Sequence, residues 1–215
     1  MDKAKKILDE LIARYPDISS CREDVWNAFL LLNKCFSDDH KLLACGNGGS
    51  SADADHMVGE LMKKFKRKRN APSDFIKKVE RIDPARASFL SQTLEQPLPA
   101  ISLSHPASLL TAFSNDVPGG DKAVFAQQVY GYGQKGDVLF AITTSGNSEN
   151  VLLAALTAKA MGIPVIALTG RDGGEIKKLA DVAIVVPEQE TYKIQERHLP
   201  IYHALCLMLE ETFFA

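Results

Sequence analysis

The chain has 215 residues, 46% of them hydrophobic and 24% charged, which suits one sizeable core and a single globular domain over residues 1–215. A formal net charge of −2 gives no reason to expect nucleic acid or an anionic membrane as the main partner. No signal-peptide pattern or bilayer-spanning apolar run is present. We therefore expect a cytoplasmic protein with reduced, buried cysteines at Cys21, Cys35, Cys45 and Cys206.

The first 37 residues form an N-terminal helical segment. Apolar residues recur at helical spacing over residues 2–14, and Pro16 ends that helix. A second helix is expected over residues 20–36, with apolar residues on more than one face. These helices serve either an oligomer interface or packing within the subunit, and the sequence leaves both open.

From residue 42 onward, short apolar runs alternate with helical stretches, the pattern of a parallel sheet covered on both faces. Strands are expected at 42–45, 98–103, 137–142, 164–168 and 182–186. Helices are expected at 106–114, 121–132, 148–161 and 174–180. The fold class is therefore α/β, a three-layer α/β/α sandwich with a five-stranded parallel sheet.

Residues 63–97 interrupt this rhythm as a helical insertion, with helical patterns near 74–80 and 84–94. The insertion opens with a basic run, residues 63–69. Such a run is either a solvated cationic face or a surface that reaches an acidic partner or a substrate phosphate.

The last segment, residues 190–214, is helical by periodicity, and Pro200 should kink or offset it. Gln195 and His203 are eight residues apart, so they fall within about one face of this helix.

Two loops follow predicted strands and precede predicted helices. The first contains Gly46, Gly48 and Gly49, and Ser50 or Ser51 can cap the helix behind it. The second runs from Thr143 to Asn150, where hydroxyls and free backbone N–H groups at a helix start can hold a phosphate. An ordinary capped polar turn explains the second loop equally well, because it matches neither the Walker nor the dinucleotide pattern.

Four side chains on two helices form a possible metal set. His56 and Glu60 are four residues apart on one face, and Gln195 and His203 share the C-terminal helix. Two imidazoles, a carboxylate and an amide oxygen suit zinc or another borderline divalent ion. Spacing alone does not show that the two helices meet.

Three motifs together resemble the sugar isomerase (SIS) family. They are Cys45–His56 (C-G-N-G-G-S-S-A-D-A-D-H), Thr144–Ser148 (T-S-G-N-S) and Leu168–Gly174 (L-T-G-R-D-G-G). The similarity extends from about residue 20 to the C-terminus and is interrupted by the insertion. It implies the SIS fold and a phosphosugar aldose–ketose isomerase, here one that converts sedoheptulose 7-phosphate to glycero-manno-heptose 7-phosphate.

The resemblance also implies roles for individual residues. Sugar-phosphate binding is implied for Asn47, Gly48, Gly49, Glu60, Asn115, Asp116 and Gln195, and phosphate binding for Thr143, Thr144, Ser145 and Ser148. One zinc per subunit is implied at His56, Glu60, Gln195 and His203. Similar proteins are homotetramers with sites at subunit interfaces.

A ketose–aldose interconversion moves a proton between adjacent carbons through an enediol, and one carboxylate can carry it. Glu60 is expected to be this base. His203 is expected to transfer protons to and from the sugar oxygens, as acid and then as base. Two alternatives remain: a non-catalytic SIS protein that binds a phosphosugar or the replication initiator DnaA, and an isomerase for another phosphosugar. Glu60 and His203 favour an enzyme, because the DnaA-binding relative resembles the isomerase without them.

Overall fold

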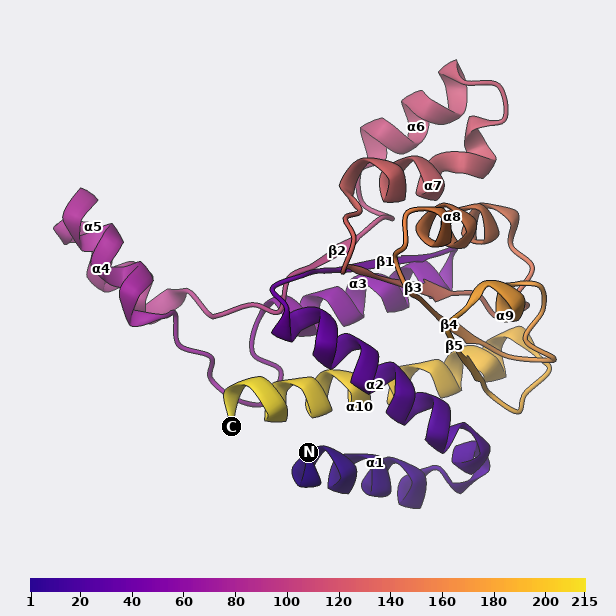
Figure 1. Ribbon diagram of the computed structural model, residues 1–215, viewed down its shortest axis with the longest axis horizontal. Coiled ribbons are helices and arrows are strands. Elements are labelled where there is room, and N and C mark those ends of the chain that lie inside the picture. The colour runs from indigo at the N-terminus through magenta and orange to yellow at the C-terminus, as the bar shows by residue number, and fades with distance from the viewer.

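A computed structural model describes residues 1–215 and contains one five-stranded sheet. Its strands are β1 (Leu42–Gly46), β2 (Ala100–Ser102), β3 (Val138–Ile142), β4 (Val165–Thr169) and β5 (Val182–Val185). All neighbours pair in parallel in the order β2-β1-β3-β4-β5 (Figure 1). The predicted three-layer α/β/α sandwich is confirmed.

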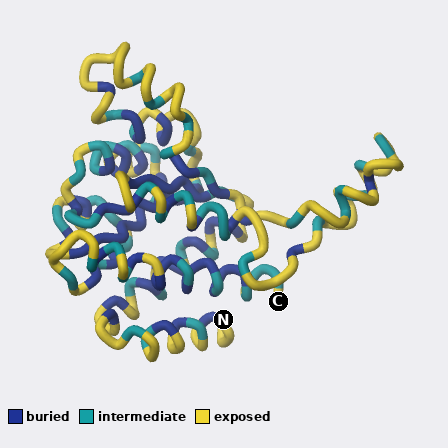
Figure 2. Tube along the Cα trace, turned by 180° about the vertical axis from the view of Figure 1, so that it is seen from behind, coloured by how far each residue is buried: buried dark blue, intermediate teal, exposed yellow.

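Alternate residues of the central strands face two separate hydrophobic cores, as the two-residue period of a strand requires. Leu42 and Ala44 belong to the larger core, whereas Leu43 and Cys45 belong to the smaller one. The three central strands, β1, β3 and β4, are buried on both faces and read as continuous apolar sequence for that reason (Figure 2).

Helices from both ends of the chain, together with the helix after β1, cover the face of the larger core. They are α1 (Asp2–Arg14), α2 (Arg22–Ser37), α3 (Gly49–Met62) and α10 (Thr191–Phe214). Residues Pro16–Cys21 form a short 3-10 helix, so α2 begins later than the sequence suggests. The α10 helix continues through Pro200 as a single element, and α1 lies along it (Figure 1).

The other face is covered by α6 (Ala107–Asp116), α7 (Gly120–Tyr132), α8 (Glu149–Ala160) and α9 (Ile176–Leu179). The α9 helix is shorter than the predicted stretch 174–180, because Gly173 and Gly174 have positive φ angles and form a loop. The β2 strand is also shorter than predicted, since the backbone N–H of Leu98 donates instead to the carbonyl of Leu61 at the end of α3.

The insertion extends away from the sheet as an arm made of α4 (Ser73–Ile82) and α5 (Pro84–Thr93) (Figure 1). The arm buries little of its own surface: no residue of α4 and only Ala87 of α5 are buried (Figure 2). Phe75, Ile82 and Phe89 are exposed.

The cysteines agree with the sequence expectation. All four are free and buried, and burial raises the pKa of each thiol, to about 12 for Cys45. None of the helices has the length and apolar character that a membrane span requires.

Candidate active site

The two predicted loops lie side by side at the carboxyl end of the sheet. From β1 the chain passes to β2 on one side, and it then returns to β3 on the other side of β1. Such a reversal of strand order opens a crevice at the carboxyl ends of the two strands, where ligands bind in open α/β sheets. The loops after β1 and β3 border this crevice.

Glycines in the loop after β1 are required by close contacts. Gly48 has φ +54° and precedes α3 as its N-cap, so Gly48 takes the place that we predicted for Ser50 or Ser51. An added Cβ at Gly49 would lie 2.5 Å from Nε2 of Gln195. The amide of Gln195 is therefore placed at the start of α3, beside the loop.

The loop after β3 presents hydroxyls at the N-terminus of α8. The hydroxyls of Thr143 and Ser148 lie 3.1 Å apart, and Ser148 occupies the N-cap without making a side-chain capping bond. The backbone N–H groups at this helix start can therefore bind an anion. The side-chain amides of Asn47 and Asn150 exchange two hydrogen bonds of 2.8 and 2.9 Å, which join the two loops.

A third loop, residues 170–175, supports the loop after β3 from behind. A Cβ at Gly146 would lie 2.1 Å from the carbonyl oxygen of Gly173, and both glycines have positive φ angles. The side-chain oxygen of Asn147 accepts the backbone N–H of Glu175 at 3.0 Å. These contacts fix the position of the hydroxyl-bearing loop against residues 170–175.

Three of the predicted catalytic and metal-binding side chains lie together. Nε2 of His56 is 3.4 Å from Oε1 of Glu60, and the rings of His56 and His203 stand edge to face with centroids 4.9 Å apart. Nε2 of His203 is buried and has no hydrogen-bond partner. Burial, followed by the charge of His56, lowers the pKa of His203, so its neutral form is favoured.

Gln195 lies apart from this trio. It packs at Gly49, whereas His56 is seven residues further along α3, about 10 Å at the rise of an α-helix. Within the chain, no group of three or more His, Cys, Asp or Glu side chains is arranged to hold a metal ion. Two polar regions therefore follow one another along α3: Gln195 with the loops, then His56 with Glu60 and His203.

Asn115 and Asp116 end α6, on the opposite face of the sheet from α3. Both are exposed, and their side chains hydrogen-bond to each other at 2.9 Å. They make no hydrogen bond to another predicted site residue.

Two residues that the sequence analysis did not select complete the surroundings of His56. The hydroxyl of Tyr202 donates to Oδ1 of Asp53 at 3.2 Å and lies 3.1 Å from Nδ1 of His56. Burial, followed by the carboxylate of Asp53, raises the pKa of Tyr202, so the phenol stays protonated. A signal was present, because Asp53, His56 and Glu60 recur at positions i, i+3 and i+7, on one face of a helix.

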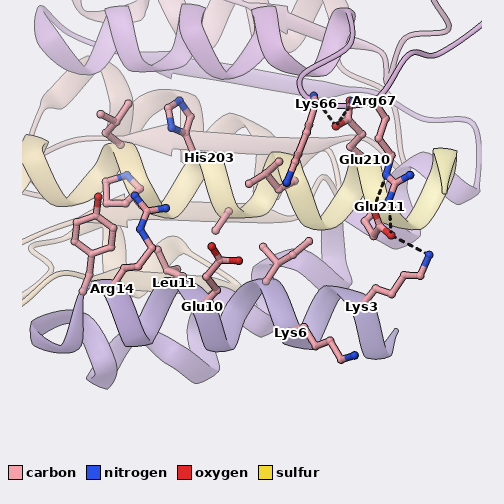
Figure 3. A pocket seen from close by; sticks show the side chains of 16 residues that line it. Lys3, Lys6, Glu10, Leu11, Arg14, Lys66, Arg67, His203, Glu210 and Glu211 are labelled. Atoms are coloured by element: carbon pink, nitrogen blue, oxygen red, sulfur yellow. Dashed lines mark hydrogen bonds and ion pairs between the residues drawn. The ribbon is translucent and has the colours of Figure 1, made fainter.

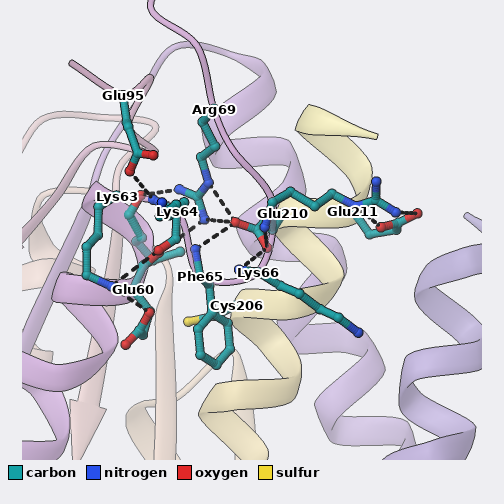
Figure 4. Close-up of polar contacts among 12 residues, drawn as sticks. Glu60, Lys63, Lys64, Phe65, Lys66, Arg69, Glu95, Cys206, Glu210 and Glu211 are labelled. Carbon is teal, nitrogen blue, oxygen red and sulfur yellow. Dashed lines mark hydrogen bonds and ion pairs between the residues drawn. The ribbon is translucent and has the colours of Figure 1, made fainter. Parts of the chain in front are cut away.

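The basic run 63–69 fixes the end of α3 and is not simply a solvated face (Figure 4). Arg69 is fully buried and donates to the backbone carbonyls of Leu61 and Glu60 at 2.7 and 3.1 Å, and its guanidinium lies 2.9 Å from Glu210. Glu210 also accepts the backbone N–H groups of Phe65, Lys66 and Arg67. We call Arg69, Glu210 and these three N–H groups the α3–α10 clamp.

The clamp determines the ionisation of Glu210. Burial opposes its ionisation, but the N–H groups of Phe65 and Lys66 and the guanidinium of Arg69 together hold its pKa below the usual range. Arg69 also donates to the backbone carbonyl of Glu60. The clamp therefore fixes the backbone position from which the Glu60 side chain extends.

A cleft of about 660 Å³ lies between α1 and α10, and His203 is among the residues that line it (Figure 3). Its rim is charged: Lys3 and Arg67 both pair with Glu211, while Lys6, Glu10 and Arg14 point from α1. His203 therefore borders an opening toward solvent between α1 and α10.

Comparison with known proteins places this arrangement in a family. A family model for the SIS domain matches residues 86–170. Phosphoheptose isomerase from a Nitratiruptor species is 43% identical over 192 residues, 89% of this chain and 88% of the relative. The Pelobacter propionicus phosphoheptose isomerase is 40% identical over 99% of this chain and 95% of its own length.

Solved structures agree with the sequence relatives. A phosphoheptose isomerase from Francisella tularensis matches with a TM-score of 0.75 and 30% identity, covering 98% of this chain and 97% of its own. The Neisseria gonorrhoeae phosphoheptose isomerase matches with a TM-score of 0.70 and 34% identity, over 97% and 92% of the two chains. The chain belongs to the phosphoheptose isomerase family of SIS-domain proteins.

Proposed function

We propose that this protein interconverts sedoheptulose 7-phosphate and the corresponding aldose, glycero-manno-heptose 7-phosphate. One observation carries the proposal: the loop after β1 lies at the N-terminal end of α3, and His56 and Glu60, with His203 of α10 beside His56, lie about two turns further along the same helix. In a heptulose 7-phosphate the reacting carbons, C1 and C2, lie at the opposite end of the sugar from the phosphate. The layout therefore suits a long phosphosugar with its phosphate at the loops.

We assign to Glu60 the proton transfer between C1 and C2 of the sugar. It removes a proton from C1 of the ketose, the C1–H electrons form the C1=C2 bond of an enediol, and the proton is delivered to C2. Glu60 is mostly shielded, with 13% of its side chain exposed, and its other oxygen pairs with Lys63 at 3.1 Å. Shielding slows exchange of the carried proton with water without preventing it.

We assign to His203 the proton transfers at the sugar oxygens O1 and O2. As the carbonyl moves from C2 to C1, O2 gains a proton and O1 loses one, so a group that is both donor and acceptor is needed. The lowered pKa of His203 keeps the ring neutral near pH 7, with one nitrogen of each kind.

We assign phosphate binding to the loop after β3. The hydroxyls of Thr143, Thr144, Ser145 and Ser148 and the N-terminus of α8 supply donors without a lysine. Asn47, Gly48 and Gly49 border the same space, with Gln195 at the junction toward the sugar. Asn115 and Asp116 keep their predicted substrate role as part of the proposal.

Zinc is part of the proposal, with His56, Glu60, Gln195 and His203 as its ligands. The donor types suit zinc, since two imidazoles and a carboxylate lie near one another and Nε2 of His203 lacks a partner, and these side chains would have to move toward a common ion to bind it. Gln195 is the exception, because it lies about two turns away along α3. When bound, zinc polarises the sugar oxygens and favours the enediolate.

Assembly and location are further parts of the proposal. We infer a homotetramer with sites at subunit interfaces, supported by the large exposed apolar side chains Phe75, Ile82 and Phe89 on the arm. A second chain would also bring side chains to the solvent-facing side of His203. A cytoplasmic location is proposed because all four cysteines are free and buried, as is usual where thiols are kept reduced.

The test is turnover of a panel of ketose phosphates with five, six and seven carbons, followed by detection of the aldose. We expect the seven-carbon substrate to be preferred. Preference for another length would transfer the activity to a different phosphosugar, and no turnover at all would favour a binding protein. Elemental analysis of protein purified without chelator tests zinc separately, and full activity of metal-free protein would remove zinc from the proposal.

A further inference from the structure

The segment that joins α3 to the arm, residues 63–69, is neither helix nor strand, yet its backbone is firmly held. The N–H of Lys64 donates to a carboxylate oxygen of Glu95 at 2.8 Å. The next three N–H groups, beginning with that of Phe65, donate to Glu210 in the α3–α10 clamp. Two carboxylates from distant parts of the chain therefore fix the backbone from which the Phe65 side chain extends.

Phe65 directs its ring at His203. The two rings are tilted by 49°, with centroids 5.2 Å apart, within the range of about 4.5–7 Å over which aromatic pairs attract. Phe65 is partly buried against the larger core beside α10, whereas the residues at 64 and 66–68 are exposed (Figure 4). The ring is thus the one side chain of residues 64–68 that the segment turns inward.

The imidazole of His203 depends on its neighbours for its orientation. The torsion that turns a histidine ring has a broad energy profile, so the ring plane is set by contacts. Nε2 of His203 is buried without a hydrogen-bond partner, so no hydrogen bond at that nitrogen fixes the plane. The ring of His56 packs against His203 at 4.9 Å and 88°, and the ring of Phe65 supplies a second contact.

We propose that Phe65 is a positioning residue for His203: held by the α3–α10 clamp, its ring fixes the plane of the imidazole. The clamp then acts on both catalytic candidates. It acts on Glu60 through the carbonyl that Arg69 binds, and on His203 through Phe65. The inference rests on the proposed function for its effect on catalysis, whereas the packing of the two rings can be tested without it.

The first test observes the ring of His203 by NMR. Histidine is labelled with ¹³C at Cε1, every sample is treated with chelator so that it is metal-free, and the His203 signal is assigned by its loss in His203→Gln. A neighbouring aromatic ring displaces this signal through its ring current. Phe65→Leu should therefore move the signal, whereas Phe65→Tyr, which keeps the ring, should leave it close to the wild-type position.

Phe213→Leu is the matched control. Phe213 is also partly buried against the larger core, but its ring pairs with Phe36, at 6.3 Å, and not with His203. An unmoved His203 signal in Phe65→Leu, or an equal displacement in Phe213→Leu, would overturn the inference. If Phe65→Leu is unfolded, the wild type decides: we expect a nuclear Overhauser effect between the ring protons of Phe65 and His203, and its absence would overturn the inference.

Kinetics give the second readout. Loss of a residue that orients a reacting or ligating side chain typically lowers activity by about 10–100-fold. We expect this fall in kcat for Phe65→Leu, with KM for the phosphosugar little changed because the phosphate is assigned to the loops. Phe65→Tyr and Phe213→Leu should retain kcat near that of the wild type. Equal kcat in the two leucine variants would contradict the effect on catalysis, and absence of turnover in the wild type would contradict the proposed function while leaving the NMR test intact.

Discussion

The substitution Glu210→Gln should destabilise the protein far more than Glu211→Gln at the next position. Each oxygen of Glu210 binds two donors: Oε1 accepts from the N–H of Phe65 and from Arg69, and Oε2 accepts from the N–H groups of Lys66 and Arg67. A glutamine retains one oxygen and turns an NH₂ group toward the other two donors. Two donors then lose their acceptor.

The charge matters as well. Arg69 has no exposed side-chain surface, and Glu210 has 2%, so the variant leaves a buried guanidinium without its counter-charge. Removing one partner of a buried ion pair costs about 3–5 kcal/mol. The exposed partners of Glu211, Lys3 and Arg67, can be solvated when Glu211 is neutralised, so its substitution should have a much smaller effect.

Urea unfolding at one fixed protein concentration measures both variants against the wild type. We expect the midpoint of Glu210→Gln to fall clearly below that of Glu211→Gln, with similar m-values. Because Arg69 also binds the carbonyl of Glu60, Glu210→Gln should lower kcat even under conditions where it is folded. Equal unfolding midpoints for the two variants would refute the role given to the clamp.

Further predictions concern the loops, one buried histidine and the phosphate. Gly49→Ala should push the amide of Gln195 away, because the new Cβ would lie 2.5 Å from its Nε2. We expect KM to rise about tenfold, which corresponds to the loss of one hydrogen bond of ~1.4 kcal/mol. Gly59→Ala is the control, because a Cβ at this position of the same helix meets no atom within 4 Å. Ser145→Ala should weaken substrate binding with little change in kcat, and an unchanged KM would place the phosphate elsewhere. Burial lowers the pKa of His198 from 6.5 to about 4, so the unfolded state takes up a proton first as pH falls. The free energy of unfolding should therefore fall by about 3 kcal/mol as the pH is lowered from 6.5 to about 4. In His198→Gln, the free energy of unfolding should depend less on pH over that range.

The sheet could be predicted from the sequence because its three central strands are buried on both faces. Continuous apolar runs such as Val138–Ile142 have few alternatives in a chain that also contains amphipathic helices. Strand ends were predicted less well. The residues at either end of β2 are decided by a partner distant in sequence, as when the N–H of Leu98 donates to Leu61.

Parts of the candidate site were also accessible. Pairs within one helix, such as His56 and Glu60, follow from spacing, and the hydroxyl-rich loop follows from its place after a strand. Contacts between elements did not follow, because spacing does not tell which turn of α10 faces which turn of α3. The parallel packing of these helices sets Tyr202 and His203 at His56 and Gln195 at Gly49.

The basic run shows the same limit. Local composition favoured a solvated face, yet Arg69 is buried because Glu210, 141 positions away in the chain, supplies its counter-charge. No local pattern encodes that pairing.

The most direct test of the account is the fate of the C1 proton with wild-type protein and Glu60→Gln. Each is incubated with sedoheptulose 7-phosphate in D₂O, and both sugars are analysed by NMR. For the wild type we expect aldose with deuterium at C2 and ketose with deuterium at C1. For Glu60→Gln we expect a loss of roughly 10²–10⁴-fold in both exchange and turnover. Exchange and turnover at near wild-type rates in Glu60→Gln would contradict the assignment of Glu60 as the base.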